Sequence, residues 1–257
     1  MIKKILIFFL ISSLFSCSLA EAKQKTCYTK AGDGHVVSPL AIPNTWDIAH
    51  NGTIGYSADY TADVAEARCA EAIGVVLYGI YRAFIPFDTS SIPSDAIITN
   101  ATLSVYCSAV LYGGSATYNY VRVVGQTTQA STTSLITADY DNCGDTHSPQ
   151  FGSDTQIQVD PTTAGLWHNF PFNSTGLGWI GKGTGGECKI GLRLGFDVVD
   201  VAIGTDVTST FQFRTSEYTG TDYDPYLIVT YRLPHSGHII TSKHYVDRVG
   251  EIIKVEN

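Results

Sequence analysis

Hydrophobic and polar residues alternate along several short stretches of this chain. Along residues 81–87, and again along residues 101–107, every second side chain is apolar. Because successive side chains of a β-strand point to opposite faces of a sheet, such a stretch presents one face suited to a core. The same pattern predicts strands at residues 75–87, 101–107, 119–125, 155–159, 167–172, 189–197, 210–215 and 226–232.

These short strands, separated by turn residues, predict an all-β fold: a two-sheet antiparallel sandwich of jelly-roll type. The composition agrees, because 15 Tyr, 24 Gly and a single Met suit strands and tight turns. The side chains expected in the core are Ile85, Phe87, Leu103, Val105, Leu192, Leu194 and Leu227.

The segment before the regular strands has a weaker pattern. Residues 27–80 read as irregular, apart from a strand-like stretch at residues 53–56. Residues 62–72 are rich in Ala and Glu, which are good helix formers, so a helical turn or two is expected there.

Residues 1–22 are expected to form a signal peptide. Two lysines precede an apolar run over residues 5–15, which is too short to span a bilayer, and a small-x-small pattern ends at Ala22. The alternative is a lipoprotein signal with an acylated Cys17, but the bulky Phe15 fits that signal poorly. The protein is therefore expected outside the cell or on its surface.

About 235 residues remain, a length that one all-β sandwich can occupy. Residues 23–233 are expected to form that single domain, since no repeat or linker divides them. Residues 234–257 form a C-terminal tail that mixes charged residues with apolar ones such as Ile240 and Tyr245. The tail is expected to be a disordered segment, an extra hairpin on the same sheet or a strand that pairs with another molecule. Its apolar content argues against simple disorder.

The formal net charge of −8 disfavours a nucleic-acid partner, because binding to phosphates requires a basic surface. The mature chain contains no apolar run long enough to predict a transmembrane helix.

Five cysteines remain after removal of the signal peptide, and export predicts at least one disulfide among them. For Cys107, which falls on the apolar face of its strand, a buried free thiol is the alternative. No Cys-x-x-Cys pair occurs, so the common zinc and redox motifs are missing. The disulfide candidates are Cys27, Cys69, Cys107, Cys143 and Cys188.

Residues 82–93 and 98–106 resemble the N-terminal signature of DNRLRE-type β-sandwich domains. Asp224-Pro225 followed by the strand at residues 226–231 is similar to their C-terminal signature, and residues 191–193 resemble the mid-domain Gly-Leu strand. The resemblance covers about residues 31–232, and it is weakest in the middle. It implies a non-catalytic module of secreted or cell-surface proteins. No binding residue is carried over, since the matched motifs are framework strands.

A carbohydrate-binding surface would need exposed aromatic rings, because the apolar faces of sugars pack on flat side chains. Trp167 lies in an alternating strand and is expected in the core, whereas Trp46 lies in an irregular region and is the better platform candidate. The ligand-binding candidates are Trp46, Tyr112, Tyr118 and Tyr120.

The loop that starts at Asp139 resembles a calcium-binding loop, because it has carboxylates at its first and third positions and a glycine at its sixth. Its metal-ligand candidates are Asp139, Asp141 and Asp145. Cys143 and Gln150 replace ligands that would close the cage, so an ordinary Asx turn is the alternative. Structural calcium is the only cofactor that the sequence suggests. A second acidic loop carries Asp197, Asp200 and Asp206.

No enzyme motif is evident: the chain has neither a Gly-x-Ser-x-Gly elbow nor a His-Glu-x-x-His pair. The glycine-rich run at residues 181–186 lacks the order of a phosphate-binding loop. We therefore expect a protein that is not an enzyme. Glycosylation sequons occur at Asn51, Asn100 and Asn173, and chance occurrence in a chain rich in Thr and Ser is the alternative.

Two functional interpretations follow. The first is a secreted, non-catalytic surface module whose partner is a surface polysaccharide that it binds or to which it attaches. The second is a structural subunit of an extracellular filament or layer, in which copies of the chain assemble by β-strand pairing.

Overall fold

The computed structural model describes residues 21–40, 43–72, 74, 76–125 and 127–234, together with residues 244–246 and 252–254 of the tail. Most of the expected signal peptide, including Cys17, lies outside the described residues, as does the rest of the tail.

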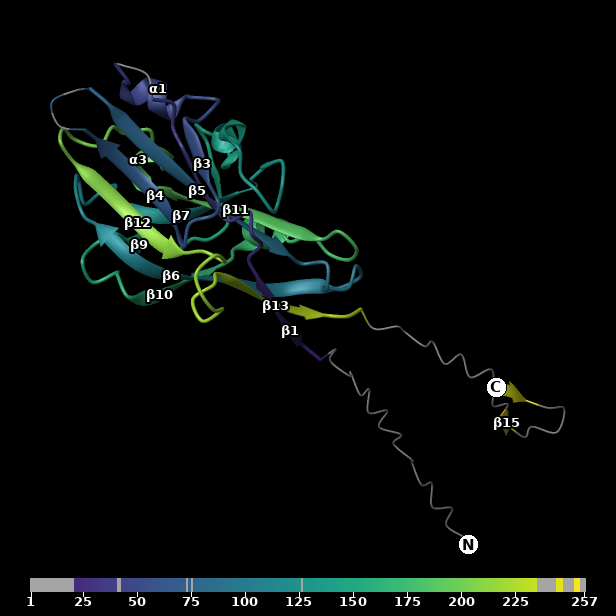
Figure 1. Ribbon diagram of the computed structural model, residues 1–257. Helices are drawn as coiled ribbons and strands as arrows, with labels where there is room; N and C mark the ends of the chain where they lie inside the picture. The colour runs from purple at the N-terminus through teal and green to yellow at the C-terminus, as the bar shows by residue number, and fades with distance from the viewer. Residues whose placement is uncertain are drawn as a thin grey trace, which may run out of the picture.

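The fold is an all-β sandwich, as predicted, and each of the expected strands overlaps an observed one (Figure 1). Within the described residues, three helices of four or five residues and one 3₁₀ turn interrupt the strands: α1 (Trp46–His50), α2 (Ser174–Gly178), α3 (Gly195–Val198) and η1 (Thr137–Asn142). The strands of the sandwich are β1 (Lys23–Tyr28), β2 (Gly34–Val37), β3 (Ser57–Asp59), β4 (Val64–Glu71), β5 (Tyr78–Asp88), β6 (Ile97–Leu111), β7 (Tyr120–Gly125), β8 (Gln150–Phe151), β9 (Ile157–Gln158), β10 (Leu166–Pro171), β11 (Glu187–Leu194), β12 (Thr208–Arg214) and β13 (Tyr226–Arg232).

All strand pairs within the sandwich are antiparallel, and the long strand β6 joins its two parts. The first half of β6 pairs with β13 and the second half with β12, while β10 pairs along the opposite edge. One part therefore runs β10-β6-β13-β1, and the other continues through β12, β4, β5, β11 and β7. The inner faces meet in one core, where the ring of His168 on β10 lies 5.8 Å from that of Phe211 on β12.

The core contains every residue that the alternation pattern placed there, and none of the seven is more than 1% exposed. Burial of each such aliphatic or aromatic side chain contributes about 1.5–3 kcal/mol to the hydrophobic stabilisation. The seven residues are Ile85, Phe87, Leu103, Val105, Leu192, Leu194 and Leu227.

Three local predictions were wrong. The strand-like stretch at residues 53–56 forms no strand, and β3 begins only after it, at Ser57. Residues 62–72 are not helical, because Val64–Glu71 forms strand β4 with strictly alternating burial, and small residues such as Ala65 and Ala67 occupy its inward positions. Tertiary pairing with β5 and β12 overrides the helix propensity of Ala and Glu. The strand predicted at residues 189–197 ends at Leu194, and α3 follows.

The expected disulfide is absent: Cys27, Cys69, Cys107, Cys143 and Cys188 are all free and buried. All five belong to the hydrophobic core, where a free thiol packs as a small apolar group. Burial raises the pKa of the Cys107, Cys143 and Cys188 thiols to about 12. These thiols therefore stay protonated, and poorly reactive, at neutral pH.

The two described tail segments pair with each other. Strand β14 (His244–Val246) is antiparallel to β15 (Ile252–Lys254), and neither pairs with a strand of the sandwich. Among the residues described, no helix has the length and apolar character needed to cross a membrane.

Candidate functional site

A row of aromatic side chains crosses the outer face of β10-β6-β13-β1. Ring centroids of successive members lie between 4.3 and 6.3 Å apart, which is the range for edge-on and offset aromatic pairs. In order across the face, the row consists of Tyr28, Tyr226, Trp167, Tyr106, Tyr223 and Tyr218.

Strand register explains why these rings meet. Trp167 lies directly opposite Tyr106 in the β10–β6 pair, and Tyr28 lies opposite Tyr226 in the β1–β13 pair. Their neighbours in sequence, such as Val105 and Leu227, point inward and are fully buried. The aromatic residues must therefore point outward; Tyr28 is 53% exposed, and the others are half-buried.

A shallow polar groove of about 280 Å³ adjoins the row on the same face. Its lining contains amides, hydroxyls, one aromatic ring and one aliphatic side chain, but no charged group. Ser104 donates a hydrogen bond of 2.6 Å to the side-chain oxygen of Asn169, which leaves the amide hydrogens of Asn169 free to donate. The lining residues are Gln24, Asn100, Thr102, Ser104, Asn169, Tyr226, Ile228 and Thr230.

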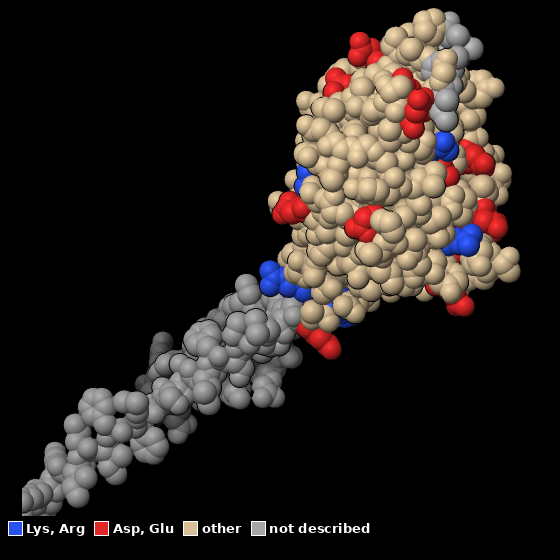
Figure 2. Space-filling view, turned by 90° about the vertical axis from the view of Figure 1, so that its left-hand side faces the viewer, with Lys and Arg blue, Asp and Glu red and all other residues tan. Residues whose placement is uncertain are grey.

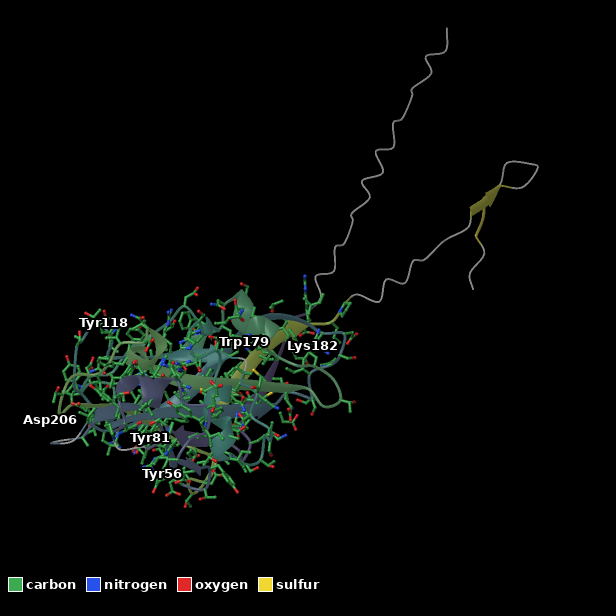
Figure 3. All side chains as sticks on the ribbon, turned by 90° about the horizontal axis from the view of Figure 1, so that it is seen from above. Tyr56, Tyr81, Tyr118, Trp179, Lys182 and Asp206 are labelled. Atoms are coloured by element: carbon green, nitrogen blue, oxygen red, sulfur yellow. The ribbon has the colours of Figure 1, made fainter. Side chains whose placement is uncertain are left out.

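The four aromatic residues predicted as ligand-binding lie elsewhere. Trp46 is only 7% exposed and donates its indole N–H to Asp200 at 2.9 Å, so it is a packed residue of α1. Tyr120 is also 7% exposed. Tyr118 packs edge-on against Phe196, at the opposite end of the sandwich from Lys182 (Figure 3). Tyr112 is exposed, but it takes part in none of the aromatic contacts of the row.

Trp167, which the alternation pattern placed in the core, is the central ring of the row. In β10 the inward side chains are those of His168 and Phe170, so Trp167, which was expected to point inward, points outward. The sequence does carry part of the signal, because Tyr106 and Tyr226 alternate with core residues. It does not carry the strand pairing that brings Trp167 beside them.

The predicted calcium loop does not bring its carboxylates together. Asp139 is buried and accepts hydrogen bonds from the main-chain N–H groups of Ala130 and Ile136, so it caps η1. Asp145 accepts hydrogen bonds from two N–H groups in an Asx turn, and these bonds lower its pKa. Asp141 accepts a bond of 2.7 Å from the hydroxyl of Thr146.

Within the described part of the chain, a different set of residues could hold a metal ion. His50, His147 and Asp200 each offer one ligand atom, and these atoms lie within 4.8 Å of one another. Of the second predicted acidic loop, only Asp200 belongs to this set, since Asp197 is buried between two arginines.

The sequons differ in their surroundings. Asn51 and Asn100 are exposed, and Asn100 lies in the polar groove. Asn173 instead caps α2: its side-chain oxygen accepts the N–H of Gly176, and its amide donates to Phe151 and Asp154. Its amide is therefore already occupied in the folded protein.

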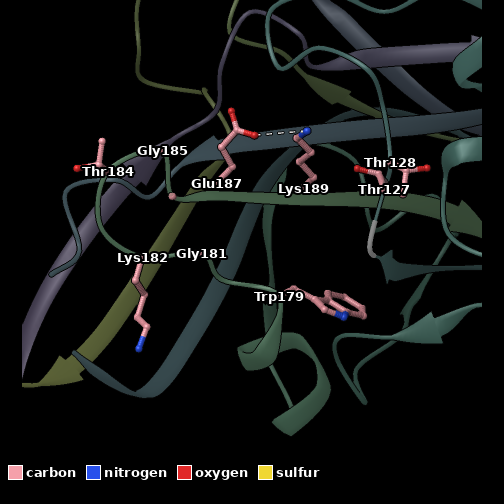
Figure 4. A pocket seen from close by; sticks show the side chains of 10 residues that line it. Thr127, Thr128, Trp179, Gly181, Lys182, Thr184, Gly185, Glu187 and Lys189 are labelled. Atoms are coloured by element: carbon pink, nitrogen blue, oxygen red, sulfur yellow. Dashed lines mark ion pairs between the residues drawn. The ribbon is translucent and has the colours of Figure 1, made fainter. Parts of the chain in front are cut away.

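A second cleft, of about 600 Å³, lies beside the glycine-rich loop at residues 181–186 (Figure 4). Lys189 forms a 3.4 Å ion pair with Glu187 there, and Lys182 donates to the carbonyl oxygen of Ala96 at 2.6 Å. The Trp179 ring is 7% exposed and packs closely over two glycines, Gly125 and Gly152. This cleft therefore lacks a free aromatic face on which a sugar could stack.

No known family model matches the chain, and no curated protein matches it.

The surface agrees with the acidic composition. Figure 2 shows acidic side chains scattered over the face in view, without a continuous basic patch.

Proposed function

We propose that the protein is a secreted, non-catalytic surface module that binds a polysaccharide on the outer face of β10-β6-β13-β1. One observation carries this proposal: a continuous row of outward aromatic rings borders a groove lined by uncharged amides and hydroxyls. The rings supply surfaces for the apolar faces of sugar rings, and the groove supplies donors and acceptors for their hydroxyls.

The chemistry of the face favours a neutral glycan. No charged side chain lines the groove, so it offers no cationic partner to a uronate, sulfate or phosphate group. Arg214, whose guanidinium lies 4.0 Å over the Tyr218 ring at the end of the row, is outside the groove. The net charge of −8 also repels anionic polymers at long range. A row of several rings suits an extended polymer, since consecutive sugars can each contact a different ring.

The test is binding of the purified protein to neutral glycans on a glycan array. Calorimetry with a soluble oligosaccharide that binds on the array then measures the affinity. Trp167→Ala should weaken binding by about tenfold or more, because loss of a stacking contact worth about 1.4 kcal/mol changes the dissociation constant tenfold. Tyr112→Ala is the matched control, since Tyr112 is equally aromatic and exposed but lies outside the row. Circular dichroism would check that both variants fold.

Two outcomes would contradict the proposal. One is the absence of binding to any neutral glycan by the full-length protein. The other is binding that survives Trp167→Ala but is lost when Lys182 and Thr184, in the glycine-rich cleft, are replaced by alanine.

A filament subunit remains the alternative, and two observations favour it. Along the described residues, β1 pairs only with β13 and β10 only with β6, so each has an edge able to accept another strand. The tail strands β14 and β15 do not use these edges in their own chain. Truncation after Leu233 and negative-stain electron microscopy test this alternative: filaments that form without the tail would exclude assembly through it.

A further inference from the structure

His50, His147 and Asp200 come from three separate loops and converge at one end of the sandwich. His50 ends α1, His147 lies in the loop after η1, and Asp200 follows α3. Their ligand atoms lie within 4.8 Å of one another, with His50 fully buried and the other two exposed. No spacing motif could have revealed the group, because about a hundred residues separate the two histidines.

The two ring nitrogens of His50 face different partners. Its Nε2 lies 3.0 Å from the main-chain oxygen of Asp197, and a carbonyl oxygen can only accept, so Nε2 carries a hydrogen. Its Nδ1 lies 3.1 Å from the side-chain oxygen of Asn51 and 3.3 Å from the Asp200 carboxylate. A carboxylate also only accepts, so a neutral ring would place two lone pairs against each other. A positive charge at Nδ1, carried by a proton or by a metal ion bound between Nδ1 and the carboxylate, would resolve this conflict.

The distance between these two atoms fits a tetrahedral metal. Zinc binds histidine nitrogen at about 2.0–2.1 Å and carboxylate oxygen at about 2.0–2.2 Å, so two ligands at the tetrahedral angle lie roughly 3.4 Å apart. The observed separation of 3.3 Å matches that edge. The third ligand, His147, is exposed, and its ligand atom lies within 4.8 Å of the other two.

The surrounding structure holds the first two ligands in place. The indole N–H of Trp46 donates to the same Asp200 oxygen at 2.9 Å, which orients the carboxylate. The bond from His50 to a main-chain carbonyl fixes its tautomer, which is the usual outer-shell arrangement for metal-bound histidine.

A buried ion network connects the three loops. Arg82 donates to the main-chain oxygen of His50 at 3.0 Å, and Arg193 donates to the main-chain oxygens of Asp145 and Thr146, next to His147. Both guanidinium groups bind the carboxylate of Asp197, whose own main-chain oxygen accepts from His50. The network therefore positions all three ligand-bearing segments relative to one another before any ion binds.

We propose that His50, His147 and Asp200 form a binding site for a divalent transition metal of the zinc class. Two imidazole nitrogens and one carboxylate oxygen suit Zn²⁺, Ni²⁺ or Cu²⁺ better than Ca²⁺ or Mg²⁺, which prefer oxygen ligands. A polar cavity of about 400 Å³ borders His147 and leaves room for water at a fourth position. Because the ligands come from three loops, bound metal crosslinks them and stabilises the folded state.

The test is titration of the apo, full-length protein with Zn²⁺ against a chromophoric chelator, with the metal content confirmed by mass spectrometry. One Zn²⁺ ion per protein molecule should bind with micromolar or better affinity and raise the melting temperature of the protein. Substitution of Co²⁺ should give the visible absorption of a tetrahedral site. Ca²⁺ in excess should not displace either ion.

Two variants and one control make the test specific. His147→Ala and Asp200→Asn should each weaken Zn²⁺ binding by at least about tenfold, a loss like that seen when outer-shell partners are removed. Both residues are exposed, so the variants should fold. The control replaces the tail histidines His235, His238 and His244 by alanine and should retain the full equivalent. Binding that is unchanged in His147→Ala, or lost in the tail variant, would overturn the proposal.

Discussion

Arg82 and Asp197 are 115 residues apart in the chain and form a fully buried, two-pronged ion pair, with N···O distances of 3.0 and 2.9 Å. Arg193 binds the same carboxylate from the other side. Burial alone would raise the pKa of Asp197, but the two guanidinium groups hold it well below its usual value. The carboxylate therefore stays ionised in the core.

Asp197→Asn should destabilise the protein by about 3–5 kcal/mol, because removal of one partner leaves uncompensated buried charge. The free energy of unfolding in urea, measured by circular dichroism, checks this prediction. Lys30→Ala is the control: it removes a partly exposed 3.5 Å pair with Glu187, and such pairs contribute about 0–1 kcal/mol. Equal effects of the two substitutions would show that the buried network does not stabilise the fold.

Asp33 predicts a pH dependence of stability. It is fully buried and accepts two hydrogen bonds from Ser216, yet burial and the neighbouring Glu217 carboxylate raise its pKa to about 8. Its ordinary value is 3.8, so between about pH 4 and pH 8 the folded state binds more protons than the unfolded state. The stabilisation is fully present below that range and is lost as the pH rises through it.

Asp33→Asn, which does not titrate, should therefore show a weaker fall in unfolding free energy between pH 5 and pH 8 than the parent protein. Urea titrations at several pH values measure this slope, whose upper limit for one group is about 1.4 kcal/mol per pH unit. Parallel slopes for the two proteins would contradict the raised pKa of Asp33.

The buried cysteines predict slow thiol chemistry. In the unreduced native protein, Cys27, Cys69, Cys107, Cys143 and Cys188 should resist a thiol reagent and react after unfolding, because all five are buried and burial raises the pKa of each thiol. Peptide mapping without reduction gives the complementary readout. A disulfide-linked pair of peptides in that map would contradict this prediction and would support the disulfide expected from export.

The framework strands could be predicted from the sequence because their alternation is strong and local. In strand β13, Leu227 points inward and its neighbour Tyr226 points outward, and the two-residue period of a strand predicts both orientations. Strand β4 was missed because its inward positions carry alanine, whose small side chain gives little hydrophobic contrast.

The candidate sites required information that local patterns do not contain. Arg82 and Arg193 alternate with core residues along β5 and β11, which would normally place them in solvent. Both are buried because the loops around α1, η1 and α3 cover that side of the two strands. The aromatic row depends on strand register, and His50 meets Asp200 only through the tertiary fold. Both sites join residues far apart in sequence, so spacing could not predict them.

The aromatic row leads to a final prediction about glycan length, which rests on the proposed function. If successive sugars stack on successive rings, affinity should rise with each added sugar until the row is filled, because each new contact contributes favourably without a new loss of rigid-body freedom. Calorimetry with a ladder of oligosaccharides of the glycan that binds would measure this rise.

Position in the row should also matter. Trp167 contacts rings on both sides, whereas Tyr218 is at one end, so Trp167→Ala should weaken binding of short and long oligosaccharides alike. Tyr218→Ala should weaken only the longer ones. If affinity were instead independent of glycan length and Tyr218→Ala affected all lengths equally, the glycan would occupy a single local pocket, and the row would serve another purpose.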